Sequence, residues 1–301
     1  MSAFRLLLPL LLWLLLPTRL LAEPAFYHLS KGDRQFWLLG SIHAAQASIY
    51  PLPDAIERAW AQSRALVLEV NMAAIPVDEW QQVASLTRLP PGRTLANEIP
   101  PALYRRTQEA ASRLGLPPAS LDGLQPWFAA ISLTQRALVK SPFSGEYGID
   151  QHFANRAAQG GKPVQGLETL TEQLGYLASV AEHQDLMLAA TLDELPELDT
   201  SFAAILAAWQ DGDEARLIAL LKEEMAPPAL QQWLEQTLLA RRNHDWLRRL
   251  PALPAESFVV VGALHLYGEQ GLLALLEGAG WRIEPLTRPE SVRAVTGSAS
   301  D

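Results

Sequence analysis

Two short apolar runs, far apart in the chain, each pass through a glycine and end at a histidine three residues later. The first covers residues 36–43 and ends at His43, and the second covers residues 258–265 and ends at His265. A run of β-branched and aromatic residues that stops at glycine predicts a buried strand with a sharp turn at its exit. Both histidines are then expected at the carboxyl edge of a sheet, where open α/β folds bind their ligands. Two imidazoles at one edge could share a metal ion or a substrate.

The other strand signals also lie towards the two ends of the chain. Residues 26–29 and 35–39 predict a hairpin whose second strand leads to His43. Apolar stretches at 65–70 and 162–168 predict two further strands, and residues 281–284 a last one. A strand, a helix and a strand in succession imply a right-handed parallel unit, which brings the strand ends to one edge.

Helical patterns fill the two long stretches at about 76–160 and 183–250, where no strand signal appears apart from the short one at 162–168 between them. We therefore predict an α/β (α+β) fold with a central mixed, partly parallel sheet, built from both ends of the chain, and a large inserted helical cap. The whole is expected to form a single domain over residues 23–290, followed by a flexible tail at 291–301.

The first 22 residues have the pattern of a secretory signal peptide, with Arg5 before a leucine-rich run and a small residue at Ala22. That run is shorter than the roughly 20 residues needed to span a bilayer. We therefore expect a periplasmic or secreted protein, tethered to the membrane only if the signal is not cleaved. The net charge of −9 argues against nucleic acid as a partner. The oligomeric state is not indicated.

Several kinds of enzyme are excluded by what the chain lacks. It contains no cysteine, so it has no disulfide and no thiolate nucleophile or ligand. It also has no G-x-S-x-G or H-E-x-x-H motif, no phosphate-binding loop and no dinucleotide fingerprint. Serine hydrolases, zincins and nucleotide enzymes therefore drop out.

Two of the predicted strands end in an acidic residue. Glu69 interrupts an otherwise apolar stretch, and Glu168 closes a short strand that is followed by a predicted helix start. A carboxylate at the end of a buried strand is costly unless it is paired or binds a ligand. Glu69 therefore needs a partner, and a purely structural ion pair with Arg242 is one interpretation of both acids.

Six segments of the chain, in this order, carry a family resemblance. They are Leu39-Gly40-Ser41-Ile42-His43, Val67-Leu68-Glu69-Val70, Gly148-Ile149-Asp150, Gly166-Leu167-Glu168-Thr169, Arg242-Asn243 and Val261-Gly262-Ala263-Leu264-His265-Leu266. Together they resemble the TraB/PrgY/GumN family, which is related to the Tiki membrane proteases and more distantly to the erythromycin esterases and the ChaN haem-binding proteins. The resemblance implies a mixed sheet with a helical cap. By similarity to the Tiki branch it also implies a metal-dependent, peptidase-like hydrolase, whose expected substrate is a peptide or a small molecule.

The same resemblance implies a set of metal ligands. His43, Glu69 and His265 would hold a divalent ion, manganese, cobalt or zinc, with open positions for a water molecule that the ion activates. Glu168 is then either a fourth ligand or the base that takes the proton of this water.

Four more residues receive supporting roles on this interpretation. Arg242 and Asn243 would polarise the scissile carbonyl or hold a substrate carboxylate. Asp150 would orient a histidine from behind the ligands, with Ser41 as a further contact. For Asp150 and Asn243, helix capping or loop bonding is the structural alternative.

Two other functions remain open. In the first, no metal takes part, and a histidine acts as general base with a carboxylate orienting it, as the esterase relatives suggest. In the second, the protein is not an enzyme and binds a peptide signal or haem beneath its cap. For either histidine taken alone, a hydrogen bond to a loop carbonyl is the structural alternative.

Overall fold

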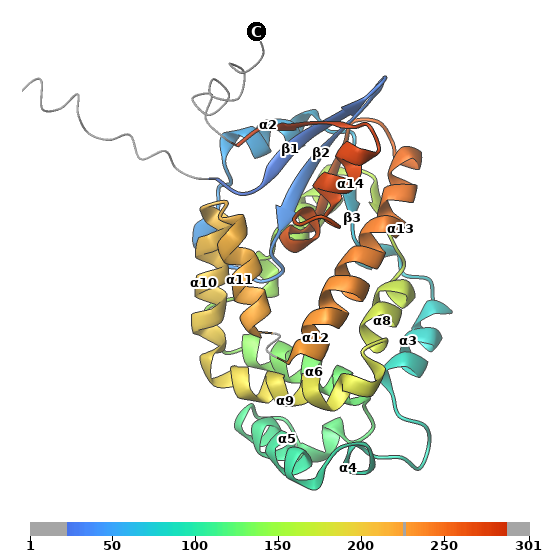
Figure 1. The fold of residues 1–301 in the computed structure, drawn as a ribbon, viewed down its shortest axis with the longest axis vertical. Coiled ribbons are helices and arrows are strands. Elements are labelled where there is room, and N and C mark those ends of the chain that lie inside the picture. Colours follow the sequence, from blue (N-terminus) through green and yellow to red (C-terminus); the bar gives the residue numbers. More distant parts are fainter. Residues whose placement is uncertain (1–22, 225–226, 288–301) are drawn as a thin grey trace, which may run out of the picture.

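The computed structural model describes residues 23–224 and 227–287. The predicted signal peptide and the predicted tail lie outside the described residues. The molecule is elongated, with a sheet and its covering helices at one end and a cap of helices at the other (Figure 1). No helix within the described ranges is both long and apolar enough to cross a membrane.

The described strands form one mixed sheet in the order β4-β3-β5-β2-β1-β6. Their bounds are β1 (Phe26–Lys31), β2 (Arg34–Ser41), β3 (Ala65–Leu68), β4 (Val164–Gly166), β5 (Ser257–Gly262) and β6 (Arg282–Pro285). β1 pairs antiparallel with β2 and β6, whereas β2, β5, β3 and β4 run parallel. The predicted mixed sheet built from both ends of the chain is therefore confirmed. Since β5 is inserted between β2 and β3, the two ends of the sequence meet at the centre of the sheet.

The central strands are apolar on both faces, as expected for parallel strands covered by helices. In β5, Phe258 and Val260 enter one hydrophobic core, and Val259 and Val261 enter the other. This two-residue alternation follows from the pleat of the strand.

Helices cover both faces of the sheet. The core on one face takes side chains from α2 (Asp54–Gln62), α7 (Ile149–Gly160), α10 (Leu198–Gln210) and α11 (Glu214–Glu224). The other face packs against α13 (Arg242–Arg249) and α14 (Leu272–Gly278).

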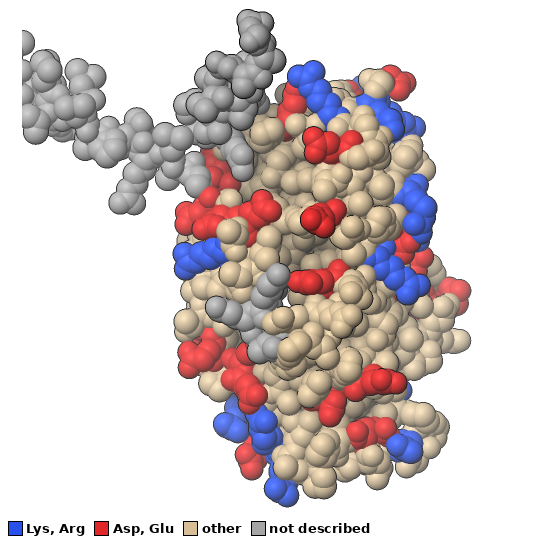
Figure 2. All heavy atoms as spheres, viewed as in Figure 1, with Lys and Arg blue, Asp and Glu red and all other residues tan. Residues whose placement is uncertain are grey.

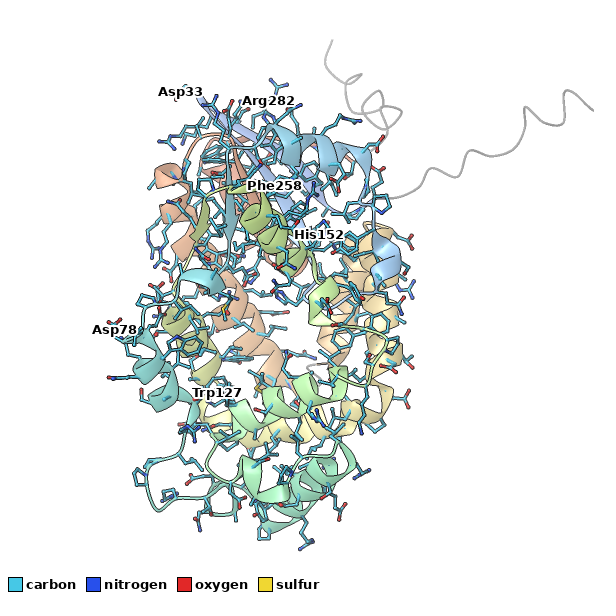
Figure 3. The ribbon with its side chains drawn as sticks, turned by 180° about the vertical axis from the view of Figure 1, so that it is seen from behind. Asp33, Asp78, Trp127, His152, Phe258 and Arg282 are labelled. Atoms are coloured by element: carbon cyan, nitrogen blue, oxygen red, sulfur yellow. The ribbon has the colours of Figure 1, made fainter. Side chains whose placement is uncertain are left out.

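The cap consists of helices that pack mainly on one another. They are α3 (Glu79–Thr87), α4 (Leu95–Glu98), α5 (Pro101–Arg113), α6 (Pro126–Leu138), α8 (Leu170–Ala178), α9 (Gln184–Glu194) and α12 (Pro228–Trp233). Figure 3 shows the separation, with Phe258 at the sheet end and Trp127 of α6 in the cap. Four helices within the two predicted cap ranges, α7, α10, α11 and α13, contribute instead to the cores on the two faces of the sheet.

A π-helical segment, η8 (Leu234–Arg241), joins α12 to α13 in one continuous helical run. A π-helix has a wider turn than an α-helix, and such segments are frequent at functional sites. The next two residues, Arg242 and Asn243, are buried beneath the sheet edge although they follow the exposed Arg241. The π-segment therefore delivers two polar side chains to the interior.

Candidate active site

The two G-x-x-H segments meet at the carboxyl edge of the parallel strands. β2 and β5 are neighbours in register, with Ser41 opposite Gly262. A Cβ placed on Gly262 would lie 3.3 Å from Glu69 Oε1, 3.6 Å from His265 Cδ2 and 3.7 Å from His43 Nε2. The structure therefore gathers both histidines and Glu69 around one point.

Glycine is required at this edge because backbone segments pass very close to one another. A Cβ on Gly40 would lie 2.8 Å from Leu266 Cδ1 and 3.1 Å from Ala263 Cα. A Cβ on Gly148 would lie 2.3 Å from the carbonyl oxygen of His43. Real Cβ atoms almost never come within 3.0 Å of a backbone atom, so the approach of Gly148 to His43 requires glycine. A Cβ at position 40 would require Leu266 and Ala263 to shift.

His43 forms a dyad with Asp150, a residue in the first turn of α7. Its Nδ1 lies 2.9 Å from Asp150 Oδ2, while Ser41 Oγ donates to Asp150 Oδ1 at 2.9 Å. A carboxylate only accepts hydrogen bonds, so in the neutral ring Nδ1 carries the proton and Nε2, which points towards Gly262, is the acceptor. The side chain of His43 is 70% exposed. The charge of Asp150 raises the pKa of His43 to about 9.

Arg242 occupies the middle of a buried ion cluster. Its Nε donates to both Glu168 oxygens at 3.1 and 3.3 Å, and its Nη2 donates to Glu69 Oε2 at 2.7 Å and to Glu168 Oε1 at 2.5 Å. Its Nη1 lies 3.0 Å from His265 Nε2 and 3.5 Å from the carbonyl oxygen of Leu238. A guanidinium group has five N–H donors. Since these bonds engage all five, none remains for a substrate carbonyl or carboxylate.

The cluster controls the charge of its two carboxylates. Burial alone would raise the pKa of Glu69, but the neighbouring groups His265, Arg242 and His43 lower it to about 2. The pKa of Glu168 stays above its ordinary value because burial outweighs the bonds from Arg242. Glu69 is therefore ionised at every pH at which the protein is expected to work.

His265 is held as a neutral imidazole of one tautomer. The side-chain nitrogen of Asn243 donates to the carbonyl oxygens of His265 and Gln270 at 3.1 and 2.8 Å. Its side-chain oxygen, 2.7 Å from His265 Nδ1, must therefore accept from this nitrogen. The lone pair then lies on Nε2 and accepts from Arg242. Burial lowers the pKa of His265 to about 3, so this ring stays uncharged.

Gln173 of α8 joins the two carboxylates and was not among the residues selected from the sequence. Its Nε2 donates to Glu69 Oε2 at 3.0 Å and to Glu168 Oε1 at 3.2 Å. The backbone N–H of Gly262 supplies a further bond to Glu69 Oε1 at 2.8 Å. Glutamine five residues after a strand-end acid is no recognisable motif, so the sequence carried no signal for it.

Trp246 is the second unpredicted member of the site. Its Nε1 donates to Glu168 Oε2 at 3.1 Å, and its ring lies 4.4 Å from that of His265 and 4.7 Å from the Arg242 guanidinium carbon. It follows Arg242 by four residues, so both lie on one face of α13. That spacing is a signal that could have indicated it.

The arrangement does not fit the predicted metal centre. Across 23–224 and 227–287, no group of three or more His, Asp or Glu residues is placed to hold one ion. The lone pair of His265 and one oxygen of Glu69 face the guanidinium of Arg242, which already supplies the positive charge. A divalent ion would have to displace this group. Binding of manganese, cobalt or zinc therefore remains a prediction, and no step below depends on it.

A family model described as TraB/PrgY/gumN family matches residues 25–285. The chain belongs to the TraB/PrgY/gumN family. The match runs from the start of β1 to the end of β6, so this TraB/PrgY/gumN domain comprises the whole sheet and the cap. The resemblance seen in the sequence is thus confirmed.

Two relatives in the comparison are both called uncharacterized protein YbaP, one from Escherichia coli (strain K12) and one from Shigella flexneri. Each is 28% identical to the chain over 267 residues, which covers 88% of this chain and 96% of the relative. No solved structure matches the chain. Membership of the TraB/PrgY/gumN family therefore identifies the domain, and any activity has to be argued from the site itself.

Proposed function

We propose that the protein is a hydrolase of an ester or amide bond, peptide bonds included, in which His43 acts as general base without a metal ion. The observation that carries this proposal is the dyad of His43 and Asp150, with Nε2 of an exposed ring and Glu69 Oε1 both close to one position beside Gly262. We prefer it to the metal-dependent interpretation because the guanidinium of Arg242 lies where the ion would be needed.

The chemical steps follow from the different surroundings of the two ring nitrogens of His43. A water molecule beside Gly262 would donate one hydrogen to His43 Nε2 and the other to Glu69 Oε1, since both acceptors face that point. As the water oxygen attacks the carbonyl carbon of the substrate, its proton passes to Nε2. The imidazolium, stabilised by Asp150, then returns this proton to the leaving oxygen or nitrogen.

The raised pKa of His43 favours the return of the proton to the leaving group more than the uptake of the proton from water. With a pKa of about 9, the ring is mostly protonated at neutral pH, and roughly one molecule in a hundred carries the free base. The rate of a base-catalysed reaction should therefore rise with pH until His43 is neutral. The proton transfer to the leaving group is in turn favoured by a well-stabilised imidazolium.

The buried cluster acts as a rigid support on this proposal. Arg242 has no free donor, so we assign to it the positioning of Glu69 and Glu168 and not contact with substrate. Glu69 Oε1 is the part of the cluster that faces His43 Nε2. Its negative charge also favours the protonated form of His43.

Hydrolysis can be tested with purified, chelator-treated protein against p-nitrophenyl esters and a fluorogenic peptide library. His43→Ala should reduce kcat by about 100-fold or more, the usual contribution of a general base. His183→Ala, which changes a histidine of the cap outside the site, is the matched control and should leave kcat unchanged. Loss of activity on chelation, with recovery on adding manganese, cobalt or zinc, would refute the proposal and support the metal centre instead.

A further inference from the structure

Gln173 lies one turn inside α8, the cap helix that starts directly after Glu168. The helix begins with a capping box, in which Thr169 Oγ1 accepts from the N–H of Glu172 at 3.1 Å and Glu172 Oε2 accepts from the N–H of Thr169 at 2.9 Å. This box fixes the phase of the helix. Glu168 then precedes the cap residue, and Gln173 is the fourth residue of α8, two positions whose side chains often meet at helix starts.

The two sides of α8 have different partners. Leu174 and Leu177 pack into the core of the cap. Glu172 forms an ion pair with Arg249 of α13, with 2.7 Å between Oε1 and Nη2. Figure 2 shows basic and acidic side chains beside one another along the edge of the molecule where Figure 1 places α8 and α13. α8 is therefore held between the cap and the helix that supports the site.

The side-chain amide of Gln173 closes a ring of four hydrogen bonds. Its Nε2 donates to Glu69 Oε2 at 3.0 Å and to Glu168 Oε1 at 3.2 Å. Arg242 Nη2 donates to the same two oxygens, at 2.7 and 2.5 Å. Each nitrogen carries two hydrogens, so each donates one hydrogen to either carboxylate. The two acids are thus held together by one positive charge and one neutral amide.

This ring also fixes the other oxygen of Glu69. Since both oxygens belong to one planar carboxylate, a displacement of Oε2 turns Oε1 as well. Oε1 accepts from the N–H of Gly262 at 2.8 Å and lies beside the position of the attacking water. Without the amide of Gln173, the guanidinium of Arg242 alone would have to offset two buried carboxylates whose like charges repel one another. Glu69 Oε2 would then move, and Oε1 with it.

We propose that Gln173 is a positioning residue of the reaction, whose amide sets the orientation of the Glu69 carboxylate and thereby the place of the attacking water beside His43. Gln173 acts through Glu69 and does not touch the reacting atoms. The inference rests on the proposed hydrolase function, which it deepens by naming the cap residue that arranges its site.

Kinetics of Gln173→Met tests this role in purified, chelator-treated protein with a neutral p-nitrophenyl ester. Methionine has a similar length but no donor, so kcat should fall roughly tenfold, within the loss caused when a reacting group is misplaced by up to about 1 Å. KM should stay within about twofold of the wild-type value, as expected for an interaction needed in the transition state. Gln81→Met, at an exposed glutamine of the cap helix α3, is the matched control and should leave both constants unchanged.

The Hε1 resonance of His43 in NMR gives a readout that needs no turnover. The charge of Glu69 is among the groups that raise the pKa of His43. Loss of the amide donor weakens the charged form of the two carboxylates and displaces Glu69 Oε1, so Gln173→Met should lower the pKa of His43. Gln81→Met should leave this pKa as it is in the wild type. A loss of packing alone would reduce the stability of the Gln173 variant without moving the pKa of His43.

Gln173→Asn provides a second variant of the same position. It keeps the amide but is one methylene shorter, so it cannot bridge both carboxylates and should change kcat and the pKa of His43 in the same direction. Far-UV circular dichroism shows whether each variant is folded. A wild-type kcat, or an unchanged pKa of His43, in either folded variant would overturn the positioning role and leave the hydrolase standing. Absence of hydrolysis by the wild-type protein would refute the hydrolase and, with it, this role.

Discussion

Replacing Arg242 by methionine is the most informative perturbation of the buried cluster. Methionine fills much of the same space but leaves the carboxylates of Glu69 and Glu168 without their cation. Breaking a buried ion pair in this way costs about 3–5 kcal/mol. Each carboxylate keeps two other donors, Gln173 with either Gly262 or Trp246. We therefore expect a loss near the lower limit, about 3 kcal/mol of the free energy of unfolding.

The loss should depend on pH with a defined sign. In the wild type the pKa of Glu69 is about 2, below its ordinary value of 4.5, so its contribution to stability is present above pH 4.5 and is lost between pH 4.5 and 2. Without Arg242, burial should raise this pKa above 4.5. The folded variant then takes up protons as the pH falls, and the destabilisation measured at pH 8 should shrink at pH 5.

Urea unfolding, followed by tryptophan fluorescence at pH 8 and pH 5, measures this effect through the midpoint and the m-value. Arg241→Met is the matched control, because Arg241 precedes it in the same helical run and is exposed. It should cost less than 1 kcal/mol. If both variants unfold at the same urea concentration at pH 8, or if the loss does not shrink at pH 5, Arg242 is not the cation that compensates the cluster.

Three further outcomes follow from the site geometry. The Hε1 resonance of His43 should titrate with a pKa of about 9 by NMR, and Asp150→Asn should lower this pKa clearly; an unchanged titration would contradict the dyad. Gly148→Ala should cost about 1–3 kcal/mol of the free energy of unfolding, measured by thermal denaturation, because its Cβ would lie 2.3 Å from the carbonyl oxygen of His43. The control Gly175→Ala lies within α8, where a Cβ meets no atom within 4 Å, and should be neutral or stabilising. Trp209→Phe should cost about 1–2 kcal/mol of the free energy of unfolding, because it removes the hydrogen bond from the indole N–H to the carbonyl oxygen of Gly40. A smaller change in the urea midpoint would show that water replaces the indole N–H as donor.

Much of the fold is visible in the sequence because the strands are short apolar runs bounded by glycine and turn residues. The hairpin of β1 and β2 and the strand β5 lie close to where the residue pattern predicts them. The two G-x-x-H segments also predict a shared sheet edge, since parallel strands end at the same side. The local residue pattern was sufficient to predict these strands and turns because they depend on burial and backbone geometry within a few residues.

The chemistry of the site was decided by tertiary packing. The sequence indicates that Glu69 needs a partner, but it leaves open whether that partner is a metal ion or Arg242. Only the fold, which inserts β5 between β2 and β3 and turns a π-helical segment inward, places the guanidinium among the predicted ligands. Gln173 completes the cluster with no motif of its own. A buried charge must be compensated by a group that the packing brings within hydrogen-bond distance, and here these groups come from separate helices. Their spacing along the chain does not indicate which groups will meet.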